Sequence, residues 1–411
     1  MVSNNLLNGS LPQELGALRE LIFLALDGNS LISPIPASMG NLSNLFSLQL
    51  QHNKLSGSVP PEIGKMRNLY GLELQHNKLS GSVPLEIGKM GYLSYLNLQN
   101  NELSGSIPRE IGMMGKLDTL FLLNNSFSSS IPQEVGMMRS LTQLDLSSNS
   151  LIGPIPSSIG NLSKLRRLYL YSNNLSGSIP KELGLLKHLW VVQLQRNRLT
   201  GPIPASIGNL VELSDLTLSQ NKLSGSIPTT IGNLTKLTTL SLFMNKLSGS
   251  IPLEMNNLTS LINLQLSDNN FTGHLPPQIC QTGTLVTFVT ANNHFKGPIP
   301  KSLKNCTRLY RVRLDESQLT GDIAEDFNIY PNLNYIDLSG DNLYGELSSK
   351  WGQCHNLTSL KISNNKISGK IPLELGEATR LGVLDLSSNH LIGKIPKELG
   401  ALEVIAQNSF E

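Results

Sequence analysis

One amino-acid pattern recurs every 24 residues along this chain of 411 residues. It reads Leu-x-x-Leu-x-Leu-x-x-Asn-x-Leu, for example over residues 45–55 and again over residues 69–79. Because the interval never slips, all repeats must form coils of one size, and such coils stack on one another. The polar landmark of the pattern lies at Asn5, Asn29, Asn53, Asn77, Asn101, Asn125, Asn149, Asn173, Asn197, Asn221, Asn245, Asn269, Asn293, Ser317, Asp341, Asn365 and Asn389.

The residues before each landmark predict a short strand. Leucine alternates with other residues there, so the leucines point inward and the stacked strands form a parallel sheet on the concave face. The landmark asparagine turns the chain inward, where its amide can bond backbone groups that would otherwise be buried and unpaired. Ser317 and Asp341 are predicted to do part of that work.

The residues after each landmark predict the convex side of the coil. They read Leu-x-Gly-x-Ile-Pro, as at Leu103–Pro108. The glycine permits a tight bend, and the proline ends strand pairing and can begin a short helical turn. Ile111-Gly112 and its equivalents close the back of the repeat. We therefore predict an α/β solenoid, a right-handed superhelix with 24-residue repeats. It covers residues 1–400 in about 16–17 repeats, starting in mid-repeat, and a divergent tail follows at 401–411.

Composition excludes several classes of function. Charged residues make up only 15% of the chain and the net charge is +2, which argues against nucleic acid as a partner. The sequence has no apolar run of membrane-spanning length and no secretory signal at its start. It also lacks phosphate-binding, metalloprotease and kinase motifs. We therefore expect a binding protein, not an enzyme, with no cofactor and no metal.

The repeat matches the leucine-rich-repeat signature, and its Gly-x-Ile-Pro segment resembles the plant extracellular subclass, as in Ser172–Gly184. Four later segments are similar to the ectodomains of the male-discoverer-interacting receptor-like kinases: Ser302–Leu314, Tyr330–Ser339, Trp351–Asn365 and Leu384–Gly400. The resemblance implies a plasma-membrane glycoprotein that signals, also in immunity, with its repeats on the extracellular face. It further implies a secreted peptide or protein ligand and a shorter leucine-rich-repeat co-receptor kinase.

The chain departs from that family pattern at both ends. It lacks the signal peptide, the cap with its cysteine pair, the membrane helix and the Ser/Thr kinase, so we expect a fragment or a truncated gene product. The leading hypothesis is the ligand-binding segment of a receptor. The alternative is a free-standing inhibitor or scaffold that binds another protein, like those that block cell-wall-degrading enzymes.

Side chains that lie six, four, two and one positions before each landmark are predicted to face outward from the concave sheet. Aromatic residues and arginines gather among them in the middle of the array, a composition typical of binding hot spots. The alternative is that any solenoid shows scattered exposed aromatics. The predicted ligand-binding residues are Tyr95, Phe121, Leu123, Asp145, Arg167, Tyr169, Tyr171, Gln195, Arg196 and Asp215.

Histidine and cysteine positions give two smaller hypotheses. His52 and His76 share one phase in adjacent repeats, so they form either a pH-sensing or metal pair or simply two surface histidines. Cys280 and Cys306 lie one coil apart on the convex side, within bridging reach, whereas Cys354 is two coils from Cys306. We predict a Cys280–Cys306 disulfide in an oxidising compartment; the alternative is three reduced, buried thiols.

Recurring Asn-x-Ser/Thr sequons suit a secreted glycoprotein, although the repeat itself supplies many of them. The convex Asn-Leu-Ser/Thr turns are the sites where occupancy is most expected. The predicted glycosylation sites are Asn8, Asn41, Asn161, Asn174, Asn233, Asn257, Asn270, Asn305 and Asn356.

Overall fold

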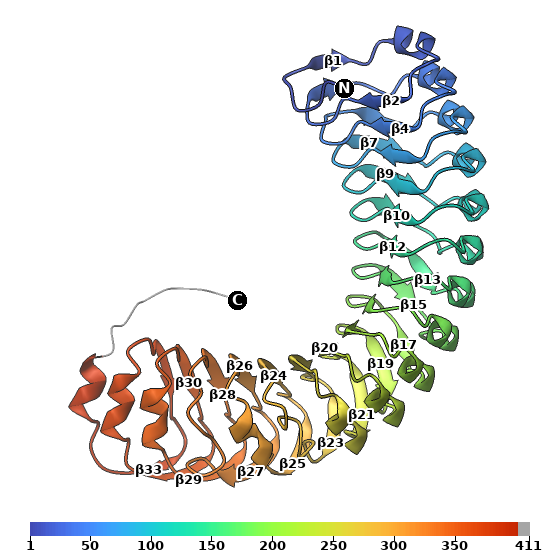
Figure 1. Ribbon diagram of the computed structural model, residues 1–411. Coiled ribbons are helices and arrows are strands. Elements are labelled where there is room, and N and C mark those ends of the chain that lie inside the picture. The colour runs from blue at the N-terminus through green and yellow to red at the C-terminus, as the bar shows by residue number, and fades with distance from the viewer. Residues whose placement is uncertain (402–411) are drawn as a thin grey trace. The chain divides into compact units, whose positions relative to one another are not determined.

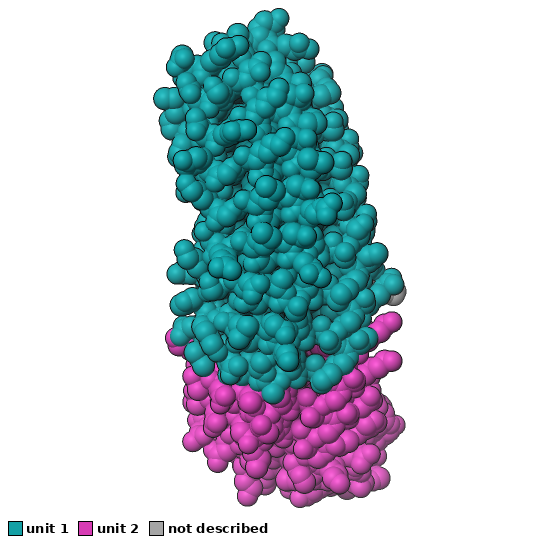
Figure 2. Space-filling model, turned by 90° about the vertical axis from the view of Figure 1, so that its right-hand side faces the viewer, with its two compact units in different colours: residues 1–213 teal, residues 214–411 magenta. Residues whose placement is uncertain are grey.

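A computed structural model describes residues 1–401 and divides into two compact units, Met1–Leu213 and Ser214–Glu411. Figure 2 colours the two units separately. Each unit is built of the predicted coils, and in each the strands that precede the landmarks form a parallel sheet. The tail predicted at 401–411 lies outside the described residues, apart from Ala401 at the end of the last helix.

In unit 1 each coil carries a strand of the long sheet, a second short strand after the landmark, and a 3-10 helix (Figure 1). The sheet strands are β2 (Phe23–Ala25), β4 (Ser47–Gln49), β6 (Gly71–Glu73), β8 (Tyr95–Asn97), β10 (Thr119–Phe121), β12 (Gln143–Asp145), β14 (Arg167–Tyr169) and β16 (Val191–Gln193). The second strands are β1 (Asn8–Ser10), β3 (Ser30–Ile32), β5 (Ser56–Gly57), β7 (Lys78–Gly81), β9 (Glu102–Gly105), β11 (Ser126–Phe127), β13 (Ile152–Pro154), β15 (Asn174–Ser176) and β17 (Thr200–Gly201). The helices are η1 (Gln13–Ala17), η2 (Ala37–Asn41), η3 (Pro61–Lys65), η4 (Leu85–Lys89), η5 (Arg109–Met113), η6 (Gln133–Met137), η7 (Ser157–Asn161), η8 (Lys181–Leu185) and η9 (Ala205–Asn209).

Unit 2 repeats this arrangement, but two of its coils have turns in place of the helix, at residues 277–282 and 323–325. Its sheet strands are β18 (Asp215–Thr217), β20 (Thr239–Ser241), β22 (Asn263–Gln265), β24 (Thr287–Val289), β26 (Arg311–Arg313), β28 (Tyr335–Asp337), β30 (Ser359–Lys361) and β32 (Val383–Asp385). The second strands are β19 (Lys222–Gly225), β21 (Lys246–Ser250), β23 (Asn270–Gly273), β25 (His294–Pro298), β27 (Gln318–Asp322), β29 (Asn342–Glu346), β31 (Lys366–Gly369) and β33 (His390–Leu391). The helices are η10 (Thr229–Asn233), η11 (Leu253–Asn257), η12 (Lys301–Asn305), η13 (Ser349–Gln353), η14 (Leu373–Glu377) and η15 (Lys397–Ala401).

The strand register follows the repeat. Leu48 pairs with Leu72, and Leu72 with Leu96, so each leucine lies directly above its equivalent in the next coil. All three are fully buried. The core is therefore a continuous column of aliphatic layers, and every coil covers the leucines of its neighbours. This confirms the predicted parallel sheet.

The landmark asparagines form a second column inside the coils. At Asn53, Nδ2 donates to the carbonyls of Leu26, Leu50 and Gln51 at 3.0, 3.2 and 3.3 Å, and Oδ1 accepts from the amide of Leu31 at 3.0 Å. The same set of bonds recurs in most coils. An asparagine amide thus joins each coil to its neighbours, as predicted, because it supplies a donor and an acceptor at one site.

The two substituted landmarks behave differently. Asp341 Oδ1 accepts from the amide of Leu319 at 2.8 Å, so Asp341 keeps the acceptor half of the asparagine pattern. Its Oδ2 is buried and has no hydrogen-bond partner among residues 1–401. Ser317 Oγ is also buried without a hydrogen-bond partner in the described part of the chain, because a serine side chain is too short to reach the backbone groups that an amide reaches. The prediction that Ser317 shares the work of the landmark is therefore wrong.

Prolines precede most of the helical segments, whereas Ser348 precedes η13. Pro108 has extended backbone angles, φ −66° and ψ 136°, and η5 starts at the next residue. Each helix has five residues and is of the 3-10 type, and no α-helix occurs among residues 1–401. The helical part of the predicted α/β class thus consists only of short 3-10 helices. None of these helices in the described part of the chain has the length and apolar character that a bilayer crossing requires.

Gly112 and Gly115, three residues apart, allow a matched test of how closely the 3-10 helices pack. A Cβ added at Gly112 would collide with the carbonyl oxygen of Glu134 in the next coil, whereas a Cβ at Gly115 would meet no atom within 4 Å. We expect Gly112→Ala to destabilise unit 1 by about 1–3 kcal/mol, because the helices must move apart. Gly115→Ala should leave stability unchanged or raise it slightly, because alanine lowers the conformational entropy of the unfolded chain and meets no neighbour in the folded one. Urea unfolding of both variants measures the difference, and equal midpoints would contradict close packing at Gly112.

Candidate ligand-binding face

The outward surface of the strands β8–β16, here called the sheet face, carries most of the predicted ligand-binding residues. Tyr95 and Phe121 meet edge to face across β8 and β10, with ring centroids 6.2 Å apart. Arg167 on β14 donates from Nη1 to Oε1 of Gln143 at 3.0 Å. Tyr169 and Tyr171 are half-buried, at the end of β14 and just beyond it. Aromatic and guanidinium groups therefore lie on the same face of neighbouring parallel strands.

The remaining predicted residues of unit 1 frame this surface. Leu123 is half-buried after β10, and Gln195 has a buried Oε1 without a hydrogen-bond partner among residues 1–401. Arg196 is exposed and has a positive φ of 56°, which turns the chain away from the sheet. Asp215 belongs to unit 2, where it starts β18 and accepts a hydrogen bond from Thr217 at 2.8 Å. In unit 1 the predicted residues thus lie on, or shortly after, neighbouring strands of one sheet.

Asp145 departs from the prediction of an outward, accessible charge. It is only 9% exposed, and its carboxylate accepts hydrogen bonds from the backbone amide and the hydroxyl of Ser147. Burial raises the pKa of Asp145, and the bonds from Ser147 oppose that shift. Its side chain supports the loop after β12 and contributes little surface for a ligand.

Sequence reasoning missed a row of side chains seven positions before each landmark, where the sheet strands begin. Phe46 and Tyr70 stack at 5.0 Å and are 42% and 48% exposed. Arg166 and Trp190 occupy the same position further along, and Trp190 is 39% exposed. The signal was available, because aromatic residues recur there at the repeat interval, but the predicted outward positions began one residue later.

A second polar cluster lies on the sheet of unit 2. Arg313 forms two hydrogen bonds with Asp315, at 3.1 and 2.8 Å, and Arg311 lies 4.3 Å above the ring of Tyr335. Burial raises the pKa of Asp315, and the bonds from Arg313 oppose that shift. Arg313 is thus held by an internal partner, which lowers its availability to a ligand. Lys361 lies 3.9 Å from Asp337 in the same cluster.

The two histidines form a stacked pair. The rings of His52 and His76 have centroids 4.3 Å apart and an interplanar angle of 12°, and Nε2 of His76 lies 3.2 Å from Nδ2 of Asn100. Burial and the neighbouring His52 lower the pKa of His76. No group of three side chains suited to metal binding occurs in the part of the chain that the structure describes. The pair is a surface stack held by an asparagine.

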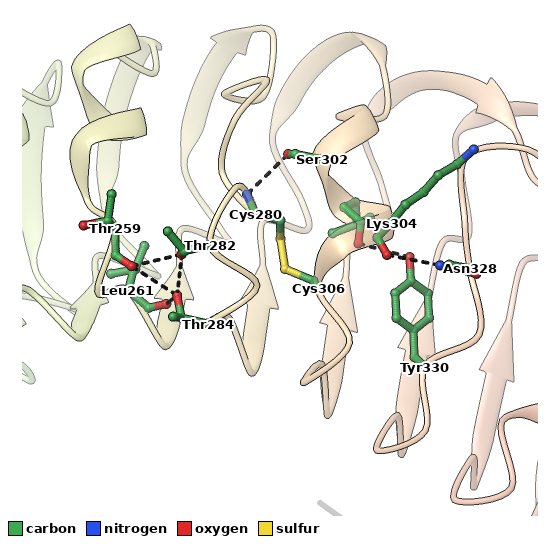
Figure 3. Close-up of a disulfide and its surroundings, with 11 residues drawn as sticks. Thr259, Leu261, Cys280, Thr282, Thr284, Ser302, Lys304, Cys306, Asn328 and Tyr330 are labelled. Carbon is green, nitrogen blue, oxygen red and sulfur yellow. Dashed lines mark hydrogen bonds between the residues drawn. A yellow bond between two sulfur atoms is a disulfide. The ribbon is translucent and has the colours of Figure 1, made fainter.

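The cysteines Cys280 and Cys306 are joined by a disulfide, with Cα atoms 5.6 Å apart (Figure 3). The bridge links a coil that has a turn in place of its helix to the residue that follows η12. The amide of Cys280 also donates to Oγ of Ser302 at 3.3 Å. Cys354 is a buried free thiol whose pKa is raised by burial. The bridge thus fastens a coil that lacks the usual helix contacts.

The predicted glycosylation sites differ in access. Asn174 and Asn356 are half-buried, and Asn356 accepts a hydrogen bond from Arg380 at 2.7 Å. Asn161, Asn233 and Asn257 each end a 3-10 helix and are exposed. The other exposed sequon residues are Asn8, Asn41, Asn270 and Asn305. Occupancy at all these sites stays a prediction.

Comparison with known proteins places the chain in a family. The model described as Leucine-rich repeat region matches residues 72–195. The model described as Leucine Rich Repeat matches residues 44–66, 188–210, 212–234, 236–258, 260–282, 356–378 and 380–402. Comparison with curated protein sequences gives no match. The chain belongs to the leucine-rich-repeat family.

The solved structures that are similar to this chain include ectodomains of plant receptor kinases. The HAESA ectodomain of Arabidopsis, in complex with an IDA peptide hormone, is 34% identical with a TM-score of 0.91 over 98% of this chain and 68% of its own. HAESA with IDA and the co-receptor SERK1 is 33% identical, with a TM-score of 0.77 over 99% of this chain and 77% of that one. The GASSHO1/SCHENGEN3 ectodomain from Arabidopsis thaliana, in complex with CASPARIAN STRIP INTEGRITY FACTOR 2, is 33% identical with a TM-score of 0.86. The match covers 98% of this chain, which spans about half (51%) of that ectodomain.

Proposed function

We propose that this chain is the ligand-binding segment of a plant cell-surface receptor-like kinase and that it recognises a secreted peptide on its sheet face. The observation that carries the proposal is the set of half-buried aromatic rings beside Arg167 on adjacent strands β8–β14. Rings held by their neighbours lose little side-chain freedom on binding, so they act as preformed anchors.

The strand arrangement suits an extended peptide. Neighbouring strands lie about 4.8 Å apart, so a peptide that crosses them meets a new row of side chains at each strand. Tyr95, Phe121 and Tyr169 stand on three such rows, and the gaps between them can receive peptide side chains. The HAESA ectodomain, to which this chain is similar, was solved with an IDA peptide hormone, and this supports the same use of the fold.

The finer assignment follows the sequence resemblance. We infer that the receptor belongs to the male-discoverer-interacting group, on the segments between Ser302 and Gly400, and that the repeats lie on the extracellular face of the plasma membrane. The HAESA structure that contains IDA and the co-receptor SERK1 supports binding to a co-receptor, and the sequence resemblance suggests a shorter leucine-rich-repeat kinase in that role. The enzymatic activity of such a receptor would reside outside this chain.

The double substitution of Tyr169 and Tyr171 by alanine tests the proposal. Peptides selected from a random library on the wild-type chain should bind the variant at least about tenfold more weakly, because two central anchors are removed. Calorimetric titration measures the change. The matched control replaces Tyr310 and Tyr344, two exposed tyrosines of unit 2 that are each 51% exposed, and should leave binding unchanged. Equal affinities for both variants would remove the sheet face from consideration.

A further inference from the structure

A pocket opens where the strands β12 and β14 of unit 1 begin. Its volume is about 430 Å³, and its lining residues come from four successive coils: Asp118, Thr142, Gln143, Arg166, Arg167 and Trp190. Four of them lie seven positions before their landmarks, in the row that the predicted binding residues omitted. The pocket lies beside the sheet face, because Arg167 belongs to both.

Arg167 is held in position by two neighbours. Its guanidinium carbon lies 4.6 Å above the ring of Trp190, and its Nη1 donates to Gln143. A guanidinium has five N–H donors in a fixed plane, so most of them remain for a ligand. No ion pair to Arg166 or Arg167 occurs among residues 1–401. Neither guanidinium is therefore engaged in a salt bridge within this part of the chain, although the carboxylate of Asp118 also lines the pocket.

The charges of the pocket favour a negatively charged group on the ligand. Asp118 on the wall offsets one arginine, so the pocket keeps an excess of one positive charge. Oδ2 of Asp118 already accepts a hydrogen bond from the hydroxyl of Thr119 at 3.0 Å. A carboxylate matches the planar donor fork of an arginine, and such bonds are stronger than those between neutral groups. The large, partly exposed ring of Trp190 can cover the apolar stem of a side chain.

We propose that this pocket binds the carboxylate of an aspartate or glutamate side chain of the peptide. The peptide must then carry an acidic residue next to the segment that contacts Tyr169. The inference rests on the proposed function, because it takes the acid to be part of a peptide on the sheet face. Arg166 and Arg167 bind the carboxylate, and Trp190 contacts the stem of the same side chain.

Tryptophan fluorescence of the full chain provides the test. The chain has two tryptophans, and Trp351 is 1% exposed, so a change on adding ligand reports on Trp190. The probes are acetylated hexamers of glutamate and of glutamine. We expect saturable binding of the glutamate hexamer, about tenfold tighter than that of the glutamine hexamer. Asp118→Asn should tighten it further, because the opposing charge is gone.

The control must distinguish specific binding in the pocket from general electrostatic attraction between the chain and an acidic peptide. Arg166→Gln/Arg167→Gln should abolish the preference for glutamate, whereas Arg67→Gln/Arg139→Gln, which removes the same charge from exposed arginines elsewhere in unit 1, should keep it. An equal loss of the preference for glutamate in both double variants would overturn the proposal. Tighter binding of a galacturonic acid trimer would overturn the assignment to a peptide. Absence of glutamate binding, with library peptides still dependent on Tyr169 and Tyr171, would overturn the pocket alone and leave the proposed function standing.

Discussion

Replacing Asp341 by asparagine is expected to stabilise unit 2 by about 4 kcal/mol at about pH 8 and by little at about pH 4. The physical reason lies in the landmark column. The oxygen Oδ2 of Asp341 is buried and lacks a hydrogen-bond partner within the described residues, at the place where other landmarks have an amide donor. By the register of the column, that donor would face the carbonyls of Leu314, Leu338 and Ser339, so an ionised carboxylate there meets acceptors only.

The pH dependence follows from the same burial. Burial, and to a lesser extent the neighbouring Asp315 and Glu316, raises the pKa of Asp341 from 3.8 to about 7, against the opposing hydrogen bond from Leu319. Below the unfolded pKa of 3.8 both states carry the proton and Asp341 has no effect on stability. Between that value and about 7 only the unfolded chain releases the proton, so wild-type stability falls by about 1.4 kcal/mol per pH unit. Above about 7 the loss is constant.

Urea unfolding of wild type and Asp341→Asn at both pH values measures this difference. The matched control is Asp385→Asn, an aspartate of unit 2 whose pKa is lowered by hydrogen bonds from Ser387. That substitution should lower stability at neutral pH, which is the opposite sign. The urea midpoint of the wild type should fall relative to that of Asp341→Asn between about pH 4 and pH 8. If it does not fall, Asp341 is solvated in the folded chain.

The repeat made most of the fold predictable, because each property depends on sequence spacing alone. The sheet register, the buried leucines and the bonds of Asn53 all follow from a coil of constant length. The proline that precedes most helices was equally readable, because a residue with a fixed φ and no N–H suits the start of a helix. The turns that replace two helices were not predicted, because the residues near Cys280 and Ile323 still fit the outline of the repeat.

The candidate site was predicted only in part, because access depends on neighbouring coils. Spacing places Asp145 on the outward side of its strand, but it cannot show that Ser147 turns back onto the carboxylate and buries it. In the same way, spacing does not show that Arg167 extends toward Trp190 of the next coil and forms one wall of a pocket. Long side chains reach beyond their own repeat, so their contacts are set by packing.

The second large effect is expected for Asn269→Ala, which should destabilise unit 2 by about 2–4 kcal/mol. Asn269 is 7% exposed and donates to the carbonyls of Leu242, Leu266 and Ser267 at 3.0, 3.1 and 3.1 Å. Each of these carbonyls has a further donor, from Asn245, Asn293 and the amide of Met244, so none is left unpaired by the substitution. The larger loss is the acceptor of the amide of Leu247, which Oδ1 of Asn269 supplies at 3.0 Å.

The neighbouring residue provides the matched control for this substitution. Asn270 is exposed, so Asn270→Ala changes the same side chain without removing a buried hydrogen bond, and should shift stability by less than about 0.5 kcal/mol. Both variants are compared with wild type by urea unfolding of protein made without glycosylation, because Asn270 begins a sequon. If the two variants unfold at the same urea concentration, the amide column does not hold the coils together and the leucine layers alone do so. A loss confined to Asn269→Ala means that stability at each landmark depends on one amide that both donates and accepts, which is the property that Asp341 and Ser317 lack.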